Sequence, residues 1–199
     1  MTKTIETLIA LGLTGCLALG GCGGDGDGNG GGGDDEVCNN KTCICESGES
    51  CDIDCAGGGC NVNCEEDATC DVDCSDSGQC ITTCAEGSTC DVVCAESCGT
   101  TCFGDQCSSD CAGGSCSDFC SGGSCDFSCG GGSCTYDCSG GSCDVDCGGG
   151  SCTVRCDAEL PCSVNCPDQT CTALCGLAEA NDCGGGVWVC NQDCNQHGP

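Results

Sequence analysis

Cysteine and aspartate recur together along this chain at short, regular spacings, and both residue types can do chemistry. Residues 143–147 read CDVDC and residues 51–55 read CDIDC. Paired thiols can form disulfides or bind soft metals as thiolates, whereas rows of carboxylates attract hard cations such as Ca²⁺. The chain has 36 cysteines and 32 acidic residues against 3 lysines and arginines, for a formal net charge of −29. This balance argues against nucleic acid as a partner, because phosphate binding needs clustered basic residues.

The paired cysteines form a tandem repeat over residues 51–175. Each unit is C-x3-C followed by a short turn, and fourteen units follow one another at 8 to 10 residues. In 143–147 the alternation places both cysteines and the central valine on one face and both aspartates on the other, which predicts a β-strand. From the most regular units we expect these residues to form disulfides, with partners left open: Cys51, Cys55, Cys60, Cys64, Cys70, Cys74, Cys125, Cys129, Cys134, Cys138, Cys143, Cys147, Cys152 and Cys156.

The spacing inside one unit excludes a disulfide between its own two cysteines. Residues four apart in a strand are separated by about 13 Å, whereas a disulfide needs Cα atoms about 4.4–6.8 Å apart. Bridges must therefore join different units. We expect an all-β fold, a disulfide-stapled two-sheet β-solenoid of 9–10-residue repeats in which two units make one turn. The alternative is an antiparallel β-meander, which would leave its cysteine and valine face uncovered.

A resemblance to a known repeat family supports the solenoid. Residues 121–152, SGGSCDFSCGGGSCTYDCSGGSCDVDCGGGSC, resemble the nonapeptide repeat of the RTX calcium-binding β-roll in period, paired glycines and strand–turn rhythm. The resemblance does not extend to the RTX calcium ligands, because cysteine and a hydrophobic residue stand where that pattern has glycine and then aspartate. Insect antifreeze solenoids, also stapled by cysteines, present ranks of threonine. We expect no continuous row here from Thr83, Thr101, Thr135, Thr153 and Thr172, so ice binding is a minor alternative.

Three middle units carry a polar residue in the central position that is aliphatic in the regular units. These residues are Thr100, Ser109 and Asp118. Burying a polar group without a partner is costly. We therefore expect a poorer core, or a local change of strand register, in the middle of the repeat.

The ends of the chain depart from the repeat. Residues 38–50 are interpreted as an N-terminal cap and residues 176–199 as a C-terminal cap and tail, because a solenoid needs atypical ends. The single tryptophan, Trp188, falls in the second of these. We interpret it as a capping residue rather than as a ligand platform.

The first residues resemble a bacterial lipoprotein signal. The apolar stretch 8–19 is shorter than the ~20 residues that a membrane-spanning helix needs. Two segments, LTGC ending at Cys16 and LGGC ending at Cys22, resemble the lipobox whose cysteine is lipidated. We favour Cys22, with Cys16 as the alternative, which makes 1–21 the signal peptide and 22–37 a glycine- and aspartate-rich tether. Setting these two cysteines aside leaves 34 of the 36, an even number that can form 17 disulfides.

These features predict an exported protein on the bacterial outer membrane or cell surface, attached to the membrane by an N-terminal lipid. We expect a structural or surface-interaction protein, a rigid acidic spacer without catalytic activity. The only histidine, His197, lies in the polar C-terminal tail, where no catalytic dyad has a scaffold. No cofactor is expected, and no protein or polysaccharide partner can be inferred.

Two alternatives involve metal ions. Stacked turns would bring carboxylates into ladders that bind a divalent cation such as Ca²⁺. The lesser alternative is a thiolate metal-sequestering protein, which would need its cysteines reduced. The candidate cation ligands are Asp52, Asp54, Asp71, Asp73, Asp144 and Asp146.

Overall fold

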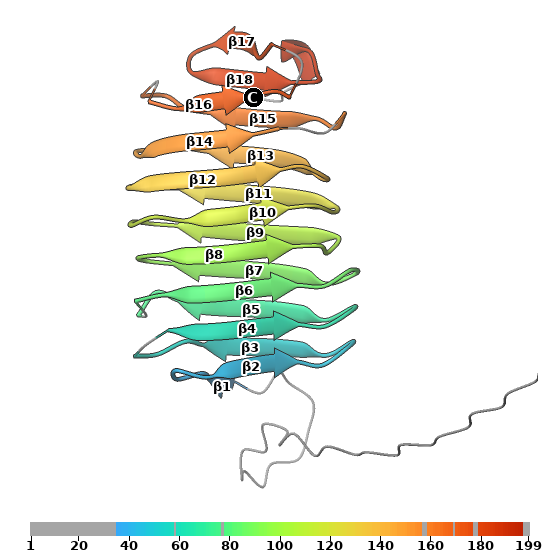
Figure 1. The fold of residues 1–199 in the computed structure, drawn as a ribbon, viewed down its shortest axis with the longest axis vertical. Helices are drawn as coiled ribbons and strands as arrows, with labels where there is room; N and C mark the ends of the chain where they lie inside the picture. The colour runs from blue at the N-terminus through green and yellow to red at the C-terminus, as the bar shows by residue number, and fades with distance from the viewer. Residues whose placement is uncertain are drawn as a thin grey trace, which may run out of the picture.

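The C-x3-C units form β-strands, as their alternation predicts. The structure, a computed structural model, describes residues 35–57, 59–76, 78–156, 159–168, 170–176 and 179–196. Residues 1–34, with Cys16 and Cys22, and His197 lie outside this part of the chain. In the described part the strands stack along one axis as two facing sheets, from β1 and β2 at one end to β17 and β18 at the other (Figure 1).

Successive strands alternate between the two sheets. One sheet, here called the odd sheet, contains β1 (Asp35–Val37), β3 (Ser50–Asp54), β5 (Thr69–Cys74), β7 (Thr89–Cys94), β9 (Gln106–Cys111), β11 (Ser124–Cys129), β13 (Ser142–Asp146), β15 (Cys162–Asn165), β18 (Val187–Cys190) and β17 (Asn181–Gly184). The other, the even sheet, contains β2 (Thr42–Cys45), β4 (Cys60–Cys64), β6 (Cys80–Cys84), β8 (Cys98–Cys102), β10 (Ser117–Cys120), β12 (Ser133–Cys138), β14 (Ser151–Arg155) and β16 (Thr172–Leu174).

The strands that make up the repeat pair in parallel, which confirms the solenoid and excludes the meander. Equivalent cysteines pair in register from turn to turn, so Cys70 lies beside Cys90 and Cys90 beside Cys107. One turn therefore takes 17 to 20 residues, or two repeat units. The only helix in the described segments is the three-residue 3-10 turn Cys194–Gln196, and none there is long and apolar enough to cross a membrane.

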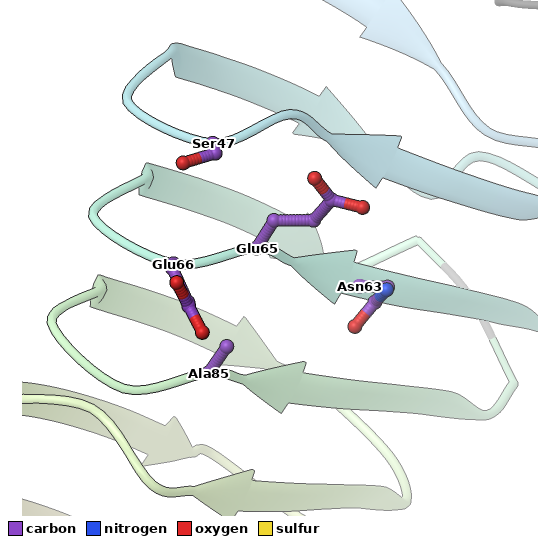
Figure 2. Close-up of a pocket in the computed structure, with 5 residues that line it drawn as sticks. All are labelled: Ser47, Asn63, Glu65, Glu66 and Ala85. Atoms are coloured by element: carbon purple, nitrogen blue, oxygen red, sulfur yellow. The ribbon is translucent and has the colours of Figure 1, made fainter. Parts of the chain in front are cut away.

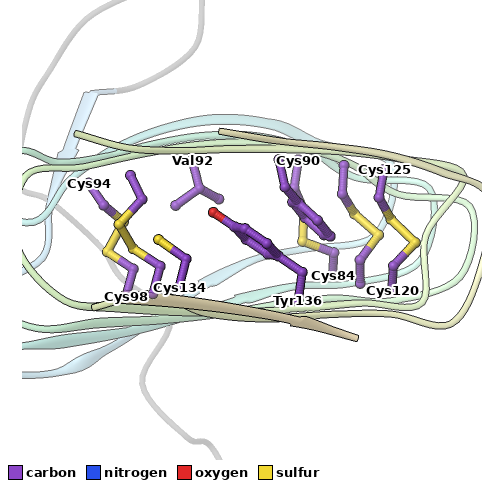
Figure 3. Close-up of a cluster of buried hydrophobic side chains, with 14 of the residues drawn as sticks. Cys84, Cys90, Val92, Cys94, Cys98, Cys120, Cys125, Cys134 and Tyr136 are labelled. Carbon is purple, nitrogen blue, oxygen red and sulfur yellow. A yellow bond between two sulfur atoms is a disulfide. The ribbon is translucent and has the colours of Figure 1, made fainter. Parts of the chain in front are cut away.

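The core is a layer of cysteines and central side chains between the two sheets. Ile53, Val72 and Val145 are fully buried, as the alternation predicts. Two aromatic side chains fill the same layer: Tyr136 extends from the even sheet (Figure 3) and stacks on Phe127 of the odd sheet, with ring centroids 5.1 Å apart. Each sheet thus contributes a single layer of side chains to the core, and most of these buried residues are cysteines.

Disulfides cross from one sheet to the other at almost every turn. Fifteen of them join cysteines only 4 to 6 residues apart in sequence, with Cα atoms 5.9–6.4 Å apart. Each bridge joins different units, as predicted, and most join the last cysteine of one strand to the first of the next. Two longer bridges, Cys175–Cys190 and Cys183–Cys194, fasten the C-terminal segment. All 34 cysteines of the described segments are paired.

The ends of the stack differ from each other. At the N-terminal end, β1 and β2 pair in parallel with β3 and β4, so the stacking already begins before residue 51. At the C-terminal end, β18 runs antiparallel to β15 and to β17, and this hairpin covers the last strand of the odd sheet. Trp188 lies opposite Val164 there and packs against the core.

Glycine turns allow the rungs of the solenoid to stack closely. Gly132 has a φ of 79°, in the left-handed region that glycine favours. A Cβ atom on Gly132 would overlap the carbonyl oxygen of Gly114 in the turn below. Gly184 has nearly the same φ, 80°, but a Cβ there would meet no atom within 4 Å.

Alanine substitutions at these two glycines distinguish the cost of backbone strain from the cost of steric overlap. We expect Gly184→Ala to lower the free energy of unfolding by about 1–2 kcal/mol through its φ alone. Gly132→Ala should cost about 1–3 kcal/mol more, because the added methyl group also displaces the adjacent turn. Calorimetric melting of both variants with disulfides intact measures the difference. Equal costs would show that the turns are not in close contact.

Candidate functional site

The outer face of the odd sheet carries rows of aspartates. Asp52 pairs in register with Asp71, and Asp71 with Asp91, while Asp54 lies beside Asp73 in the second row. Neighbouring strands are about 4.8 Å apart, so each of these five carboxylates has another directly above or below it. The six predicted candidate ligands all lie on this sheet, in two groups: Asp52, Asp54, Asp71 and Asp73 near the N-terminal end, and Asp144 and Asp146 near the other. Val93, Ser108 and Ser128 interrupt the rows between the two groups, so Asp110 and Asp146 have no carboxylate directly beside them in register.

The crowding of these carboxylates affects their titration. Partial burial raises the pKa of Asp126, and the charges of Asp144 and Asp146 on the next strand raise it further. The pKa of Asp73 is lowered instead, because Ser75 donates hydrogen bonds to its carboxylate, with the Ser75 nitrogen 2.8 Å from Oδ1. The acidic rows thus combine mutual repulsion with local hydrogen bonding.

The outer face of the even sheet is almost uncharged. The two charged residues that its strands point outward, Arg155 and Asp137, form a partly exposed ion pair with N and O atoms 3.7 Å apart. The remaining outward positions are mostly Thr, Asn, Ser and isolated apolar residues. The solenoid therefore has one acidic face and one nearly neutral face.

The threonines of the neutral face are partly in line, which corrects one expectation. They form no single row of five, but Thr135, Thr153 and Thr172 do lie in register on three successive strands. Thr83 and Thr101 pair in the other row. The two groups lie in different rows because Thr83 and Thr101 are the fourth residue of their C-x3-C units, whereas Thr135, Thr153 and Thr172 are the second.

A shallow hollow lies at one edge of the stack, where three successive turns meet (Figure 2). Its volume is about 320 Å³, and every residue that lines it is at least partly exposed. The lining residues are Ser47, Asn63, Glu65, Glu66 and Ala85. Because none of these residues is buried, the hollow offers a small ligand little enclosure.

The middle of the core contains a buried carboxyl group. Asp118 is 2% exposed, and its Oδ1 accepts a hydrogen bond from the backbone nitrogen of Thr100 at 2.8 Å. Its Oδ2 has no hydrogen-bond partner among the described residues, and neither do the hydroxyls of Thr82, Thr100 and Ser109. The register is kept through this region, with Thr82, Thr100, Asp118 and Tyr136 following one another along the even sheet. The poorer core expected here is confirmed, and no change of register occurs.

The environment of Asp118 favours its neutral form. Burial raises the pKa of Asp118 to about 6, against an ordinary value of 3.8. The hydrogen bond from the Thr100 backbone nitrogen opposes this rise in pKa, and the nearby hydroxyls of Ser109 and Thr100 oppose it further. On the next strand, burial raises the pKa of Tyr136 first of all, and the charge of Asp118 raises it further; its hydroxyl donates to the backbone oxygen of Ser128 at 3.1 Å.

The cysteines predicted to form disulfides are all bridged, and their sulfurs also come close between turns. The sulfur atoms of Cys55, Cys60, Cys74 and Cys80 lie within 4.8 Å of one another. As disulfides they have no thiolate to offer a metal ion. Thiolate binding would therefore require prior reduction.

Sequence reasoning missed several residues of these surfaces. Asp91 and Asp110 belong to the acidic rows, and Thr82 joins the buried polar positions. Their positions in the repeat could have been used to find them. Asp91 is the second residue of its C-x3-C unit, Thr82 the third and Asp110 the fourth. Their units lack the regular CDVDC pattern, which is why they were passed over.

Comparisons with protein-family models, curated proteins and solved structures gave no match to this chain.

Replacing the buried carboxyl tests its charge. The folded-state pKa of Asp118 is raised, so the stability it contributes is complete below about pH 3.8 and is lost as the pH rises through about 6. Asp118→Asn keeps the acceptor for Thr100 and removes the charge. We expect it to raise the free energy of unfolding at pH 7 by roughly 3 kcal/mol and to have no advantage at pH 3.5.

The control for this variant is Asp91→Asn, which removes an exposed carboxylate from the acidic face. It accounts for the general relief of repulsion that any lost negative charge brings. The comparison is made by thermal melting of the three proteins from pH 3.5 to 8. A pH-independent difference between wild type and Asp118→Asn would contradict the assignment.

Proposed function

We propose that this protein is a rigid, acidic, disulfide-rich spacer that a lipid holds on the bacterial cell envelope, without catalytic activity. The observation that carries the proposal is the stapled parallel stack itself, with carboxylates concentrated on the face of one sheet. The lipobox at Cys22 and the glycine-rich residues that follow it supply the anchor and tether in this proposal.

The cross-linking supports a mechanical role. Fifteen bridges close loops of only 4 to 6 residues, so at each turn the end of one strand stays covalently joined to the start of the next. In the chain-entropy account, each short loop removes about 2 kcal/mol of unfolded-state freedom. A protein held in this way resists local opening, which suits a spacer exposed outside the cell.

The charge distribution supports a role at a surface. An acidic sheet keeps copies of the protein apart by charge repulsion, whereas the neutral sheet lets the molecule approach another surface.

A second candidate function is divalent-cation binding. It is favoured by the register that stacks Asp52 on Asp71 and Asp54 on Asp73, because carboxylate oxygens in pairs suit Ca²⁺. Diffuse screening by counterions is the simpler expectation for exposed carboxylates.

The lipid anchor is tested by metabolic labelling with palmitate in a bacterial host. We expect Cys22→Ser to lose both the label and its membrane association, because the acceptor of the lipid is gone. Cys16→Ser serves as the matched control and should keep both. The opposite result would move the anchor to Cys16, and labelling of neither protein would reject the anchor.

Calcium titration by calorimetry separates the two candidate functions. For a spacer we expect small heats without saturation at a defined stoichiometry, and heats that fall as salt is added. Saturable binding would favour the cation-binding function if the double variant Asp71→Asn, Asp73→Asn lost it. Asp137→Asn on the neutral face is the control variant.

A further inference from the structure

The disulfides of neighbouring turns are in contact. The sulfur atoms of Cys60 and Cys80 are 3.8 Å apart although each belongs to a different bridge, Cys55–Cys60 or Cys74–Cys80. Neither sulfur carries a proton, so this is a contact between two disulfides. A free thiol at one of these positions would lie beside the disulfide of the next turn.

The parallel register gives the sulfurs a second set of partners. Cys60 and Cys80 pair in register on adjacent strands, which are about 4.8 Å apart. That separation lies within the Cα range of about 4.4–6.8 Å for disulfides. The native bridge from Cys60 runs across the turn to Cys55, with Cα atoms 6.0 Å apart. Bonding along the stack is therefore within the Cα separation that a disulfide allows, as bonding across it is.

Close sulfur clusters recur along both edges of the stack. Cys125 belongs to two of them and so connects three successive bridges, Cys102–Cys107, Cys120–Cys125 and Cys138–Cys143. Besides the cluster at Cys60, sulfurs lie within 4.8 Å of one another in four groups: Cys64, Cys84 and Cys90; Cys102, Cys107 and Cys125; Cys120, Cys125 and Cys143; and Cys147, Cys152 and Cys171.

We propose that these sulfur clusters carry out thiol–disulfide exchange between turns, so that a thiol pair opened in one turn can move along the edge of the solenoid. The substrate class is a dithiol, either a small molecule or a pair of cysteines on a partner protein. This activity does not depend on the lipid anchor or on the acidic face. It would make the protein a carrier of thiol equivalents as well as a spacer.

The C-terminal cluster shows the steps. Cys171 is only partly buried, and a dithiol that reduces Cys166–Cys171 becomes a disulfide itself and leaves two thiols. The Cys171 thiolate then attacks the sulfur of Cys152, which lies within 4.8 Å of it. Both cysteines directly precede the in-register pair Thr153 and Thr172. A Cys152–Cys171 bond forms, the Cys147–Cys152 bond breaks, and Cys147 leaves as a thiolate that takes up the proton lost by Cys171.

A second exchange completes the transfer. The Cys166 thiolate attacks Cys171, restores the Cys166–Cys171 bridge and releases Cys152 as a thiolate that is protonated. The net result moves the thiol pair from one turn to the next without further oxidant or reductant. The in-register geometry of the parallel strands is what brings donor and acceptor together.

Two single variants that lose the same bridge test the proposal without any reductant. Cys166→Ser leaves Cys171 free inside the cluster, whereas Cys171→Ser leaves Cys166 free, and the Cys166 sulfur lies outside it. After incubation at about pH 8.5, near the ordinary thiol pKa, each protein is quenched in acid. It is then unfolded in guanidinium chloride, alkylated with N-ethylmaleimide and mapped by peptide mass spectrometry.

For Cys166→Ser we expect a Cys152–Cys171 crosslink and label on Cys147, at least tenfold above the Cys147 label in Cys171→Ser. In the control, the label should stay on Cys166 with Cys147–Cys152 intact. Label confined to Cys171 in the first variant, or equal crosslinking in both, would overturn the proposal. Both lose the same bridge, so general destabilisation cannot produce the difference.

A second variant, in the cluster around Cys60, controls for the possibility that local unfolding at the C-terminal end produces the exchange. Cys55→Ser leaves Cys60 free, 3.8 Å from the sulfur of Cys80. We expect a Cys60–Cys80 crosslink and label on Cys74. Retention of Cys74–Cys80 with label only on Cys60 would again reject exchange between turns. Lipidation and calcium binding are measured separately, so a negative result here leaves the proposed spacer function standing.

Discussion

The structure depends on the covalent closure of each short turn by a disulfide. A two-sheet solenoid only one side chain thick on each side cannot bury enough apolar surface to offset the entropy of ordering its chain. Cysteine solves this in two ways, because the same residue fills the core and removes freedom from the unfolded state. The central aliphatic residues, such as Val72 and Val145, then add ordinary hydrophobic burial between the bridges.

Parallel stacking in register accounts for the other main properties. It repeats any residue type along a row, so aspartates at the same position of successive units become a charged ladder on one sheet. It also repeats the disulfides, which brings sulfur atoms of different bridges within 4.8 Å. The acidic face and the sulfur clusters are thus two consequences of one geometry, on the outside and on the edges of the same stack.

The parallel stack keeps its register even where polar residues replace the central aliphatic residues of the core. Asp118 takes a place that Val62 and Val154 occupy in other turns, and the strands stay in register around it. The bridges on both sides of each strand hold the backbone in place while a carboxyl group, three hydroxyls and Tyr136 share the interior. Burying this carboxyl group penalises its charged form, and the pKa of Asp118 is raised as a result.

The sequence by itself determined the strands, their inward and outward faces and the need for bridges between units. These follow from local alternation and from the short reach of a disulfide, both of which can be read from spacing alone. Only the tertiary structure decided which cysteine bonds to which and which units share a sheet. That assignment places Thr135 beside Thr153, Asp71 beside Asp91 and Cys60 beside Cys80. The reason is physical: contacts between residues 17 to 20 apart depend on the register between turns, and the period within one unit does not specify that register.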